Sequence, residues 1–591
     1  MKYLSNPINV CYKYQFNKTI SGEISVSREA ADPSMINFNG RYYMFPSMTC
    51  GFFYSDDMAE WNFHPLKSLP AYDYAPDVRV VGEYVYFCAS SHENCSFYRT
   101  KDLFSDKFEE IKSAFPFWDP NLFADDDGRI YIYWGSSPTL PLYGIELNPV
   151  DMKPIGEKKE LIAGNIKEIG YERSGEDHIP PHSPEKMAEL IRAFEESKDS
   201  IPEPIRDSAL AYVISAPYIE GVWVNKHNGV YYLQYATPGS GYNVYADGVY
   251  VAHSPLGPYK LAKNNPYSYK PGGFMAGAGH GSTMEDNEGK LWHTATMRIA
   301  KNHNFERRVG IWPAGWDHDG ELFCNQRYGD WPISVEQSKL DPWANPKWML
   351  LSYGKTASAS SSIEGKMAAN ATDENVQTWW RASSNEPGEW IEVDLGNEYA
   401  VHAVQINFAD DKLILPLPGG AELRGAHGQV RWIDETQQTT RWKLEGSEDG
   451  DNYFVIEDKS EVNTDLPHDL VINEEGIKAR YIRLTVVSLP YGQVACVSGL
   501  RIFGLGGGHA PEKAVDIKVE RISELDLDVS WKGDGTGYVV EWGFEPNKLY
   551  HSYQVFGQNV RIGALVKGQE TYVRIDSFND NGITEGDVIK V

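Results

Sequence analysis

The sequence contains little cysteine, few basic residues for its length and no long apolar run. Its six cysteines are scattered without a CxxC pair, which argues against a zinc site or a dense disulfide framework. Lys and Arg number 55 against 83 Asp and Glu, giving a formal net charge of −28, so nucleic acids and anionic membranes are disfavoured as partners. A membrane-spanning helix needs a run of about 18 apolar residues, which the chain lacks. These absences favour a protein that acts on a neutral partner.

The cysteines and the first residues leave some questions open. Cys88 and Cys95 are close enough in sequence for a bridge, although free buried thiols are the favoured interpretation. Residues 1–10 lack the apolar core of a signal peptide, which predicts a cytoplasmic protein, or an exported one whose leader has been removed. Localisation and oligomeric state therefore do not follow from the sequence.

What the chain does have is a repeated β-hairpin. In residues 117–135 (FWDPNLFADDDGRIYIYWG), Asp119 leads a strand, an acidic turn ends at Gly128, and a second strand returns. The same arrangement recurs with the leading residues Asp32, Asp77, Glu220 and His280, and with turn glycines at Gly40, Gly82, Gly229 and Gly289. Repeated strand units about 40–50 residues apart predict a β-propeller with one hairpin in each of five blades.

The five leading residues are expected to meet at the propeller axis. The innermost strand of each blade lines the central channel, so residues at the same place in each blade converge there. A single Asp beside a turn is more often a solvated carboxylate. Five polar residues in phase with five hairpins favour a shared pocket instead.

The complete chain is predicted to be all-β with three domains. Residues 1–345 form the propeller, interrupted at about 150–212 by an insertion between blades three and four. Within the insertion, Ser183-Pro184 opens a predicted helix that ends near Ser197. The insertion is either a surface excursion or a lid over the channel mouth. Residues 346–506 and 512–591 alternate like antiparallel β-sandwiches and are separated by a Gly-rich linker.

Carboxylates around a narrow channel, with many aromatic residues and no cluster of metal ligands, suit glycoside hydrolysis. That reaction needs one carboxyl group as general acid and a second as base or nucleophile. A third carboxylate can keep the acid protonated, because like charges close together resist ionising at once. The residues alone do not assign these roles.

Three segments resemble glycoside hydrolase family 43: ADPS (31–34), WDPNLFADDDG (118–128) and YIEGVWVNKHNGVYYL (218–233). The resemblance implies a five-bladed propeller and an inverting glycosidase. It implies that Asp32 is the general base, Glu220 the general acid, and Asp119 the carboxylate that tunes and orients the acid. Where the family commonly has EGP or EAP, this chain has EGV, which leaves the identity of the acid intact.

The resemblance also implies substrate contacts for Asp77, His280 and Arg298. In some members the axial histidine lies beside a calcium ion, so His280 is expected to approach a Ca²⁺ through water, although no cofactor is required. Trp118 and Trp223 flank the predicted carboxylates and are either blade core or a stacking wall for a sugar, which is the role we predict. A further charged group, His303, Arg307 and Arg308, is either solvated or in contact with substrate at the channel mouth.

The second domain resembles the discoidin, or coagulation-factor type C, family through TDENVQTWWRA (372–382), WIEVDLG (390–396) and WKLEGSEDGDNY (442–453). It is expected to be a spacer or a carbohydrate-binding module. The third resembles a fibronectin type III domain and is expected to be a spacer.

Together these observations predict an inverting, exo-acting glycoside hydrolase that releases terminal α-L-arabinofuranose from plant-derived oligo- or polysaccharides. A β-xylosidase or a β-galactosidase of the same family is the alternative within this class. A glycan-binding protein without catalytic activity is the alternative from another class.

Overall fold

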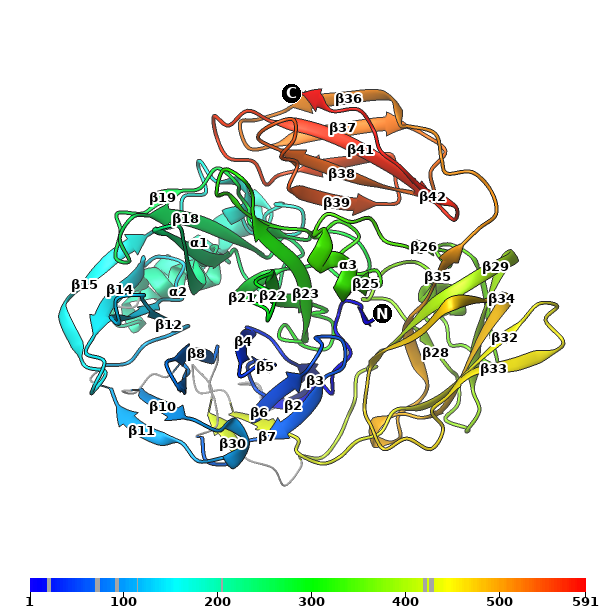
Figure 1. Cartoon of the computed structure of the whole chain (residues 1–591), viewed down its shortest axis with the longest axis horizontal. Coiled ribbons are helices and arrows are strands. Elements are labelled where there is room, and N and C mark those ends of the chain that lie inside the picture. The colour runs from blue at the N-terminus through cyan, green and yellow to red at the C-terminus, as the bar shows by residue number, and fades with distance from the viewer. Residues whose placement is uncertain are drawn as a thin grey trace.

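The structure is a computed structural model that describes residues 1–18, 23–69, 75–90, 95–113, 115–203, 206–417, 422–424 and 430–591. Within these ranges the chain forms a five-bladed β-propeller followed by two β-sandwich domains (Figure 1). The predicted all-β fold class is therefore confirmed. In Figure 1 the second domain lies to the right of the propeller and the third lies above it.

Each blade is an antiparallel sheet of consecutive strands. Blade one comprises β4 (Ser34–Phe38), β5 (Arg41–Phe45), β6 (Gly51–Ser55) and β7 (Asn62–Pro65). Blade two comprises β8 (Asp77–Val81), β9 (Tyr84–Cys88), β10 (Ser96–Thr100) and β11 (Glu109–Lys112). Blade three comprises β12 (Asn121–Ala124), β13 (Ile130–Trp134), β14 (Leu142–Leu147) and β15 (Pro154–Ile162).

Blade four comprises β16 (Glu220–His227), β17 (Val230–Thr237), β18 (Ala246–Ala252) and β19 (Lys260–Leu261), and β20 (Ser268–Tyr269) also pairs with β18. Blade five comprises β21 (Gly279–Glu285), β22 (Leu291–Arg298), β23 (Arg307–Trp316) and β24 (Leu322–Cys324). On the face opposite the insertion described below, β1 (Tyr3–Leu4) pairs with β25 (Ile333–Ser334), which leads into α3 (Val335–Leu340).

The innermost strands β4, β8, β12, β16 and β21 form a closed ring, because each contacts the next and β21 contacts β4. The first and last blades share no strand in the described chain, so other contacts join them. The backbone N–H of Met35 donates to Ser282 Oγ at 3.0 Å, and this hydroxyl donates to the carbonyl of Pro33 at 2.8 Å. Residues that precede the inner strands therefore gather at one end of the axis.

The hairpin turns follow from the residues at their tips. Asn39 (φ 52°) and Gly40 (φ 80°) both adopt positive φ, as do Asn228 (φ 50°) and Gly229 (φ 77°). An Asn-Gly pair accommodates this at low steric cost, and the resulting tight turn matches the twist of the two strands. Between the blades, apolar side chains such as Phe45, Phe52 and Phe87 fill the space and hold neighbouring sheets together.

The insertion between blades three and four begins later than predicted. The predicted start near residue 150 is wrong, because Pro154–Ile162 pairs with β14 as the outer strand β15, so the insertion spans residues 163–219. The charged sequence EKKE within β15 hid this strand, since exposed edge strands carry charge to prevent further pairing. The predicted helix is present as α1 (Pro184–Ser197), while α2 (Arg206–Val213) was not predicted.

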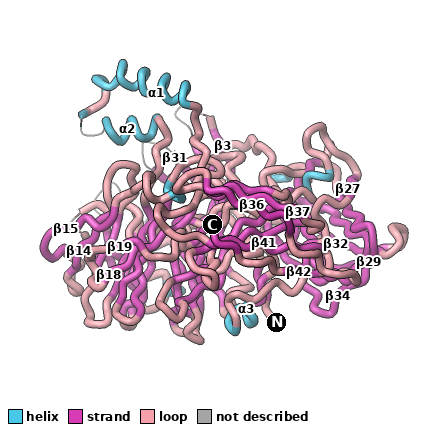
Figure 2. The backbone as a smooth tube through the Cα atoms, turned by 90° about the horizontal axis from the view of Figure 1, so that it is seen from above, coloured by secondary structure: helices cyan, strands magenta, loops and turns pink. Residues whose placement is uncertain are grey.

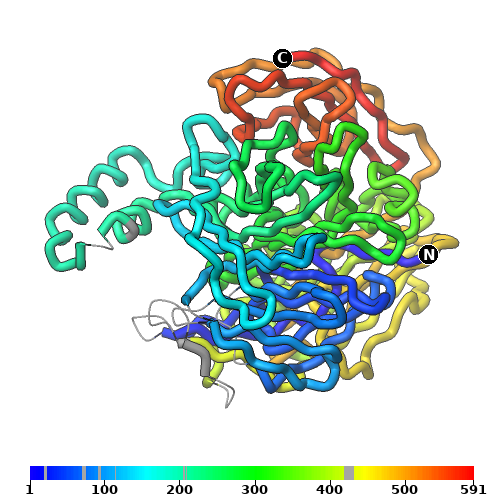
Figure 3. The backbone as a smooth tube through the Cα atoms, turned by 60° about the vertical axis from the view of Figure 1, so that its left-hand side comes forward, coloured from blue at the N-terminus to red at the C-terminus, as the bar shows by residue number. Residues whose placement is uncertain are grey.

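The two helices of the insertion stand away from the body of the protein. Figures 2 and 3 show α1 and α2 projecting from one face of the propeller, and Figure 2 shows α3 on the opposite face. The N-terminus of α1 is capped by Ser183 Oγ, which accepts the N–H of Lys186 at 3.2 Å. The stretch 168–178 of the insertion packs against the propeller and the third domain.

The second domain is a β-sandwich built on two long strands, β29 (Trp390–Phe408) and β34 (His468–Ser488). Its other strands are β26 (Met349–Leu350), β27 (Thr356–Ala359), β28 (Trp380–Arg381), β32 (Arg441–Ser447), β33 (Tyr453–Asp458) and β35 (Cys496–Leu505). Trp380 and Trp442 are fully buried in its core.

An arm of the second domain pairs with the N-terminal segment of the propeller, which was not predicted. Strand β31 (Val430–Ile433) of the arm pairs with β2 (Lys13–Lys18), so the sheet runs β3–β2–β31–β30. Here β3 is Ile24–Glu29 and β30 is Glu422–Arg424. In Figure 1 the yellow strand labelled β30 lies near the blue strand β2, and β31 lies between these two in the sheet. Two domains therefore share one sheet.

The third domain is a β-sandwich that docks on the insertion. One sheet contains β36 (Val515–Arg521), β37 (Leu527–Lys532) and β40 (Asn559–Ile562). The other contains β39 (His551–Val555), β38 (Gly537–Gly543), β41 (Tyr572–Asn579), β42 (Gly582–Thr584) and β43 (Ile589–Lys590). The N–H of Gly170 donates to the carbonyl of Leu565 at 2.8 Å, and Arg173 pairs with Asp526 at 2.6 Å.

The described chain also contains short 3-10 helices: η1 (Leu103–Ser105), η2 (Gly170–Glu172), η3 (Lys198–Ser200), η5 (Ala368–Ala371) and η7 (Pro490–Gly492). All six cysteines lie within the described ranges and none of them forms a disulfide, as favoured from the sequence. None of the helices described is long and apolar enough to span a membrane.

Candidate active site

Three side chains that precede or open inner strands meet at the axis. Asp32 (φ 49°), Asp119 (φ 48°) and His280 (φ 51°) all have left-handed backbone conformation. For a residue with a side chain this costs about 1–2 kcal/mol, so its recurrence in three blades indicates a shared structural requirement. His280 Nδ1 lies 3.4 Å from Asp32 Oδ1 and 3.9 Å from Asp119 Oδ2. The propeller thus brings together residues that are far apart in the sequence.

Asp32 is buried and held on both oxygens. Ser47 Oγ donates to Oδ2 at 2.8 Å and Arg307 Nη1 donates to Oδ1 at 3.1 Å, while the backbone N–H of Asp32 donates to Thr296 Oγ1 at 2.8 Å. Burial alone would raise the pKa of this carboxyl group, but Arg307 and His280 outweigh it and lower the pKa. Asp32 is therefore a carboxylate at neutral pH.

Asp119 has the opposite protonation tendency. Its pKa is raised to about 7, because burial disfavours its charged form and repulsion from Glu220 and Asp32 adds to this, although His280 acts in the other direction. Ser90 Oγ donates to Asp119 Oδ1 at 3.3 Å and accepts the backbone N–H of Asp119 at 2.8 Å. The pKa values of the two aspartates beside this imidazole thus differ, since only Asp32 also lies against an arginine.

His280 forms the centre of the cluster. Burial lowers its pKa, but Asp32, Asp119 and Glu220 outweigh burial, so the pKa is raised above the ordinary value. Its backbone N–H donates to Asp247 Oδ1 at 2.7 Å, which holds the backbone of His280 in place. A protonated imidazole between two carboxyl groups reduces the repulsion between them.

Glu220 reaches the cluster from the first position of β16. The strand has a bulge between Glu220 and Trp223, and Gly221 adopts a φ of 60°. A Cβ on Gly221 would lie 2.6 Å from the ring of His280, so glycine is required for β16 to lie against that ring. Tyr245 Oη donates to Glu220 Oε1 at 2.8 Å, and Ser136 Oγ donates to Oε2 at 2.9 Å. Glu220 itself is half-buried and accessible from solvent.

Replacing Asp119 by Asn is expected to stabilise the protein above neutral pH. The native pKa of about 7 exceeds the ordinary value of 3.8, so the folded state binds more protons between these values and stability falls as pH rises through this window. The variant lacks this loss, and its unfolding midpoint at pH 8 should exceed that of the wild type by about 2–4 °C, with a smaller difference at pH 5. Thermal unfolding at both pH values measures this.

Asp32→Asn is the matched control for this prediction. The pKa of Asp32 is lowered in the folded state, so its charge stabilises the fold above the ordinary pKa and that contribution is lost only as pH falls. Asp32→Asn should therefore lower the midpoint at both pH values. A midpoint for Asp119→Asn that is unchanged between pH 5 and pH 8, relative to wild type, would contradict the assignment.

The structure does not place Asp77 in the cluster, contrary to the predicted substrate contact. In blade two Ala75 (φ 48°) has the left-handed position, and Asp77 lies two residues further along the strand with 2% of its surface exposed. Asn121 Nδ2 donates to its Oδ1 at 2.9 Å, and the N–H of Leu122 donates to its Oδ2 at 2.7 Å. Burial raises the pKa of Asp77 to about 6. Asp77 joins blade two to blade three.

Trp223 occupies the position in blade four that Asp77 occupies in blade two, and it is also part of the packing between blades. The guanidinium of Arg79 lies 3.5 Å from the centre of the Trp223 ring, and Trp223 Nε1 donates to the carbonyl of Thr283 at 3.0 Å. With 3% of its surface exposed, the ring is not available to stack on a sugar. Trp118 is half-buried beside Asp119, and its predicted stacking role stays a prediction.

Arg298 lies at the end of β22 and pairs with Glu176 of the insertion. Glu176 also accepts the backbone N–H of Asn243 at 3.3 Å, so the stretch 168–178 is held against blades four and five. Burial lowers the pKa of Arg298 despite this partner. The predicted contact of Arg298 with substrate stays a prediction, with Glu176 as its partner in this structure.

Arg307 was not recognised as part of the cluster. The charged sequence KNHNFERRVG suggested solvated side chains or contacts at the channel mouth, yet Arg307 and Arg308 are both buried at the start of β23. Arg307 pairs with Asp32 and Glu29, and Arg308 Nε donates to His468 Nε2 of the second domain at 2.8 Å. The apolar run that follows (VGIW) was the signal that these arginines enter a buried strand.

The described side chains around His280 offer few oxygen ligands for a calcium ion. Two carboxyl groups lie within 4 Å of its Nδ1 and one of them is already bound to Arg307, whereas calcium prefers six to eight oxygen ligands. The calcium ion thus stays an expectation from the family resemblance, and no step below uses it.

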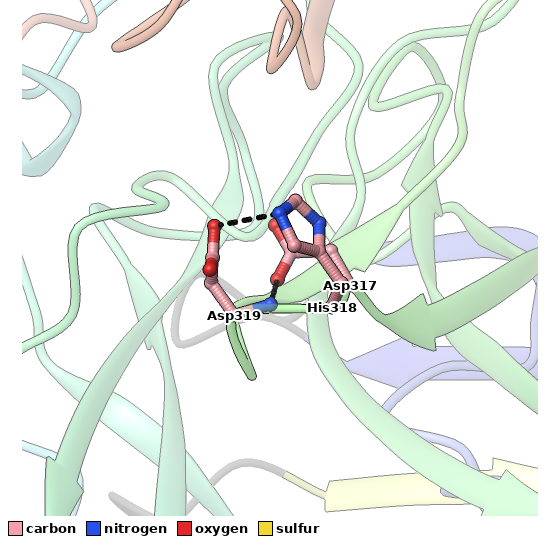
Figure 4. A group of neighbouring side chains, drawn as sticks. All are labelled: Asp317, His318 and Asp319. Atoms are coloured by element: carbon pink, nitrogen blue, oxygen red, sulfur yellow. Dashed lines mark hydrogen bonds and ion pairs between the residues drawn. The ribbon is translucent and has the colours of Figure 1, made fainter.

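Elsewhere in the described chain, Asp317, His318 and Asp319 lie close enough to share an ion (Figure 4). Lys548 of the third domain already provides the positive charge there, with its Nζ 2.9 Å from Asp317 Oδ2 and 2.5 Å from Asp319 Oδ2. This cluster therefore joins two domains.

Sequence comparison decides the family. The profile described as "Glycosyl hydrolases family 43" matches residues 25–176 and 173–322, which include Asp32, Asp119, Glu220 and His280. The chain belongs to this family. As a family-43 member it is a glycosidase that hydrolyses O-glycosyl bonds and acts on carbohydrate, and the alternative of a glycan-binding protein without activity is set aside.

A second profile, "NedA-like, galactose-binding domain", matches residues 370–484 and confirms the discoidin-like domain. The fibronectin type III resemblance of the third domain stays a prediction.

Known relatives leave the substrate of this family-43 enzyme open. It is 27% identical over 333 residues to "Xylosidase/arabinosidase 43A" of Humicola insolens, covering 49% of this chain and 95% of that protein. It is similar to the solved xylan β-1,4-xylosidase of Bacillus halodurans, with 14% identity, a TM-score of 0.38 and coverage of 98% and 97%. It is also similar to an exo-1,5-α-L-arabinanase from a bovine ruminal metagenomic library, with 20% identity, a TM-score of 0.34 and coverage of 51% and 97%. Structural likenesses of this size carry no argument about substrate.

Proposed function

We propose that this family-43 glycosidase is an inverting, exo-acting enzyme that releases terminal α-L-arabinofuranose from plant-derived oligo- or polysaccharides. In this proposal Asp32 is the general base, Glu220 is the general acid, and Asp119 tunes and orients the acid. The observation that carries it is the meeting of Asp32 and Asp119 at the ring of His280, with Gly221, the neighbour of Glu220, packed against the same ring.

The electrostatics of the cluster support these roles. Asp32 is ionised because Arg307 and His280 lower its pKa, so it can accept a proton from water. Burial, together with repulsion from Glu220 and Asp32, raises the pKa of Asp119 to about 7, so this aspartate can hold a proton beside the proposed acid near neutral pH. Glu220 is also the most exposed of the three carboxyl groups, which suits a group that must reach the oxygen of a leaving group.

The reaction then proceeds as one displacement. Asp32 removes a proton from water as the water oxygen attacks the anomeric carbon, while Glu220 donates its proton to the glycosidic oxygen as the bond to the anomeric carbon breaks. The products are the free sugar with inverted configuration and the alcohol, and solvent returns the proton from Asp32 to Glu220. Inversion requires the two carboxyl groups to be about 6.5–9.5 Å apart, which leaves room for the water molecule.

Two observations favour the exo-acting pentosidase. The insertion places Glu176 against Arg298 at the end of β22, which pairs with β21 at the end where His280 lies, so part of the insertion lies beside the site. The relative from Humicola insolens is described as a xylosidase/arabinosidase, which favours a pentose over the hexose of a β-galactosidase. A β-xylosidase is the second candidate for the same reason.

A panel of nitrophenyl glycosides tests the substrate. The α-L-arabinofuranoside is expected to be hydrolysed with a kcat/KM at least about tenfold above that of the β-D-xyloside, a difference of the size that one substituent in a sugar pocket produces. Proton NMR of the first product formed should show inverted configuration. Preference for the xyloside would favour the second candidate, and retained configuration would contradict the inverting mechanism.

A further inference from the structure

The strand that leads into the proposed base is anchored by the second domain. Strand β3 ends at Glu29, three residues before Asp32. Its neighbour β2 pairs with β31, so that Asn17 lies opposite Arg431 in the shared sheet. Arg28 adds side-chain contacts, with its Nη1 2.7 Å from Asp465 Oδ2 of the second domain. The position of the chain entering Asp32 therefore depends on both domains.

A row of alternating charges connects the second domain to Asp32. Arg431 Nη1 lies 3.2 Å from Glu29 Oε2, Glu29 Oε1 accepts from Arg307 Nη2, and Arg307 Nη1 lies 3.1 Å from Asp32 Oδ1. The ring of Phe305 lies beside both guanidinium groups, 4.9 Å from that of Arg307 and 5.3 Å from that of Arg431. The four charged residues come from the second domain, β3, β23 and the segment before β4.

All four charged groups in this row are buried. Arg431 is 1% exposed, Glu29 0%, Arg307 3% and Asp32 5%. Buried charges are strongly destabilising when a partner is removed, because water cannot replace the lost interaction. Each member is therefore held in place by its neighbour. A change at Arg431 acts on Glu29 first, then on Arg307 and finally on Asp32.

We propose that Arg431 is a positioning residue for the hydrolytic reaction, which acts through Glu29 and Arg307 to hold the Asp32 carboxylate in place. This inference rests on the proposed role of Asp32 as general base. It gives the second domain a function beyond that of a spacer or a carbohydrate-binding module: it supplies a residue on which the geometry of the active site depends.

The test uses the full-length chain with Arg431 replaced by Met, which keeps length and apolar contact but removes the charge. Because the base would be held less well, kcat is expected to fall about 10- to 100-fold, with KM changed by less than about threefold. Arg431→Lys restores a positive charge next to Glu29 and is expected to recover part of the lost kcat, so that it lies clearly above that of Arg431→Met. Circular dichroism and thermal unfolding show whether each variant is folded at the assay temperature.

The matched control is Arg480→Met, which removes an arginine of the same domain that pairs with Asp394 at 2.7 Å and is more than one-third exposed. Its kcat should stay within about twofold of the wild type, as for most isolated surface pairs. Glu29→Gln is the second variant, to be used if Arg431→Met does not fold. It removes the charge that holds Arg307 with little change of shape, and the same loss of kcat is expected.

Two results would overturn the inference. One is a folded Arg431→Met enzyme with wild-type kcat. The other is an equal loss of kcat in Arg431→Met and Arg431→Lys, which would assign the effect to packing alone. Asp32→Asn, measured beside them, separates a failure of this inference from a failure of the proposed function. If Asp32→Asn keeps wild-type activity, the assignment of the base is wrong. If Asp32→Asn is inactive and Arg431→Met is unaffected, the base stays assigned and only the role of Arg431 is removed.

Discussion

Replacement of Asp32 by Asn is expected to lower kcat about 1,000- to 10,000-fold. An amide cannot accept the proton of the attacking water, and general base catalysis typically contributes a factor of this size. The loss should be similar for substrates with good and poor leaving groups, because activation of water is needed in every case. Steady-state kinetics on the arabinofuranoside, with enzyme preparations free of wild type, measure it.

Asp77→Asn is the control for Asp32→Asn. Both residues are buried aspartates next to an inner strand, but Asp77 bonds Asn121 and Leu122 between blades. Its replacement is expected to lower the unfolding temperature while kcat stays within about threefold of the wild type, since effects on packing away from the reacting atoms are small. If Asp77→Asn lost as much activity as Asp32→Asn, or if Asp32→Asn kept more than a tenth of the activity, the assignment of the base would be wrong.

Replacement of Glu220 by Gln is expected to have an effect that depends on the leaving group. The amide oxygen can still accept from one of Tyr245 and Ser136, and the amide nitrogen can donate to the other, but the amide has no acidic proton for the glycosidic oxygen. For natural oligosaccharides, whose leaving alcohol needs that proton, kcat should fall about 1,000-fold or more. For a dinitrophenyl glycoside, whose leaving group departs without protonation, the decrease should be less than about 30-fold.

The difference between the two substrates is the measurement that identifies the acid. Glu285→Gln is a suitable control, because Glu285 lies at the other end of an inner strand and is exposed. It should leave both activities unchanged within about twofold, as is usual for surface substitutions. Equal losses on both substrates in Glu220→Gln would remove Glu220 from the role of acid and indicate a role in substrate binding.

The propeller could be predicted because its blades are local structures. Each hairpin has its own turn residues and its own alternation of apolar side chains, and both are encoded within about twenty residues. Asn39-Gly40 and Asn228-Gly229 are examples in which the turn is evident in the two residues themselves. Asp32, Asp119, Glu220 and His280 could then be placed together, because the repeat puts the start of every inner strand at one end of the axis.

The error at Asp77 came from the phase of the repeat. Blades one and three read Asp-Pro-Ser and Asp-Pro-Asn, with the aspartate two residues before the strand. In blade two the same three positions read Ala75-Pro76-Asp77, so the aspartate falls two residues later and faces the next blade. Aligning the three segments on their prolines would have shown that Ala75, and not Asp77, corresponds to Asp32.

The sequence by itself determined the all-β class, the blades, the helix of the insertion and the residues that meet around His280, since these depend on short-range pattern and a regular repeat. Only the tertiary structure revealed the row from Arg431 through Glu29 and Arg307 to Asp32, because its members come from segments up to 402 residues apart. The tertiary structure alone also revealed that Asp32 and Asp119 differ in their protonation. Both are buried aspartates beside one histidine, and their pKa values differ because an arginine from another strand lies against only one of them. Such long-range pairing leaves no pattern in the sequence, since it depends on distances that only the folded chain defines.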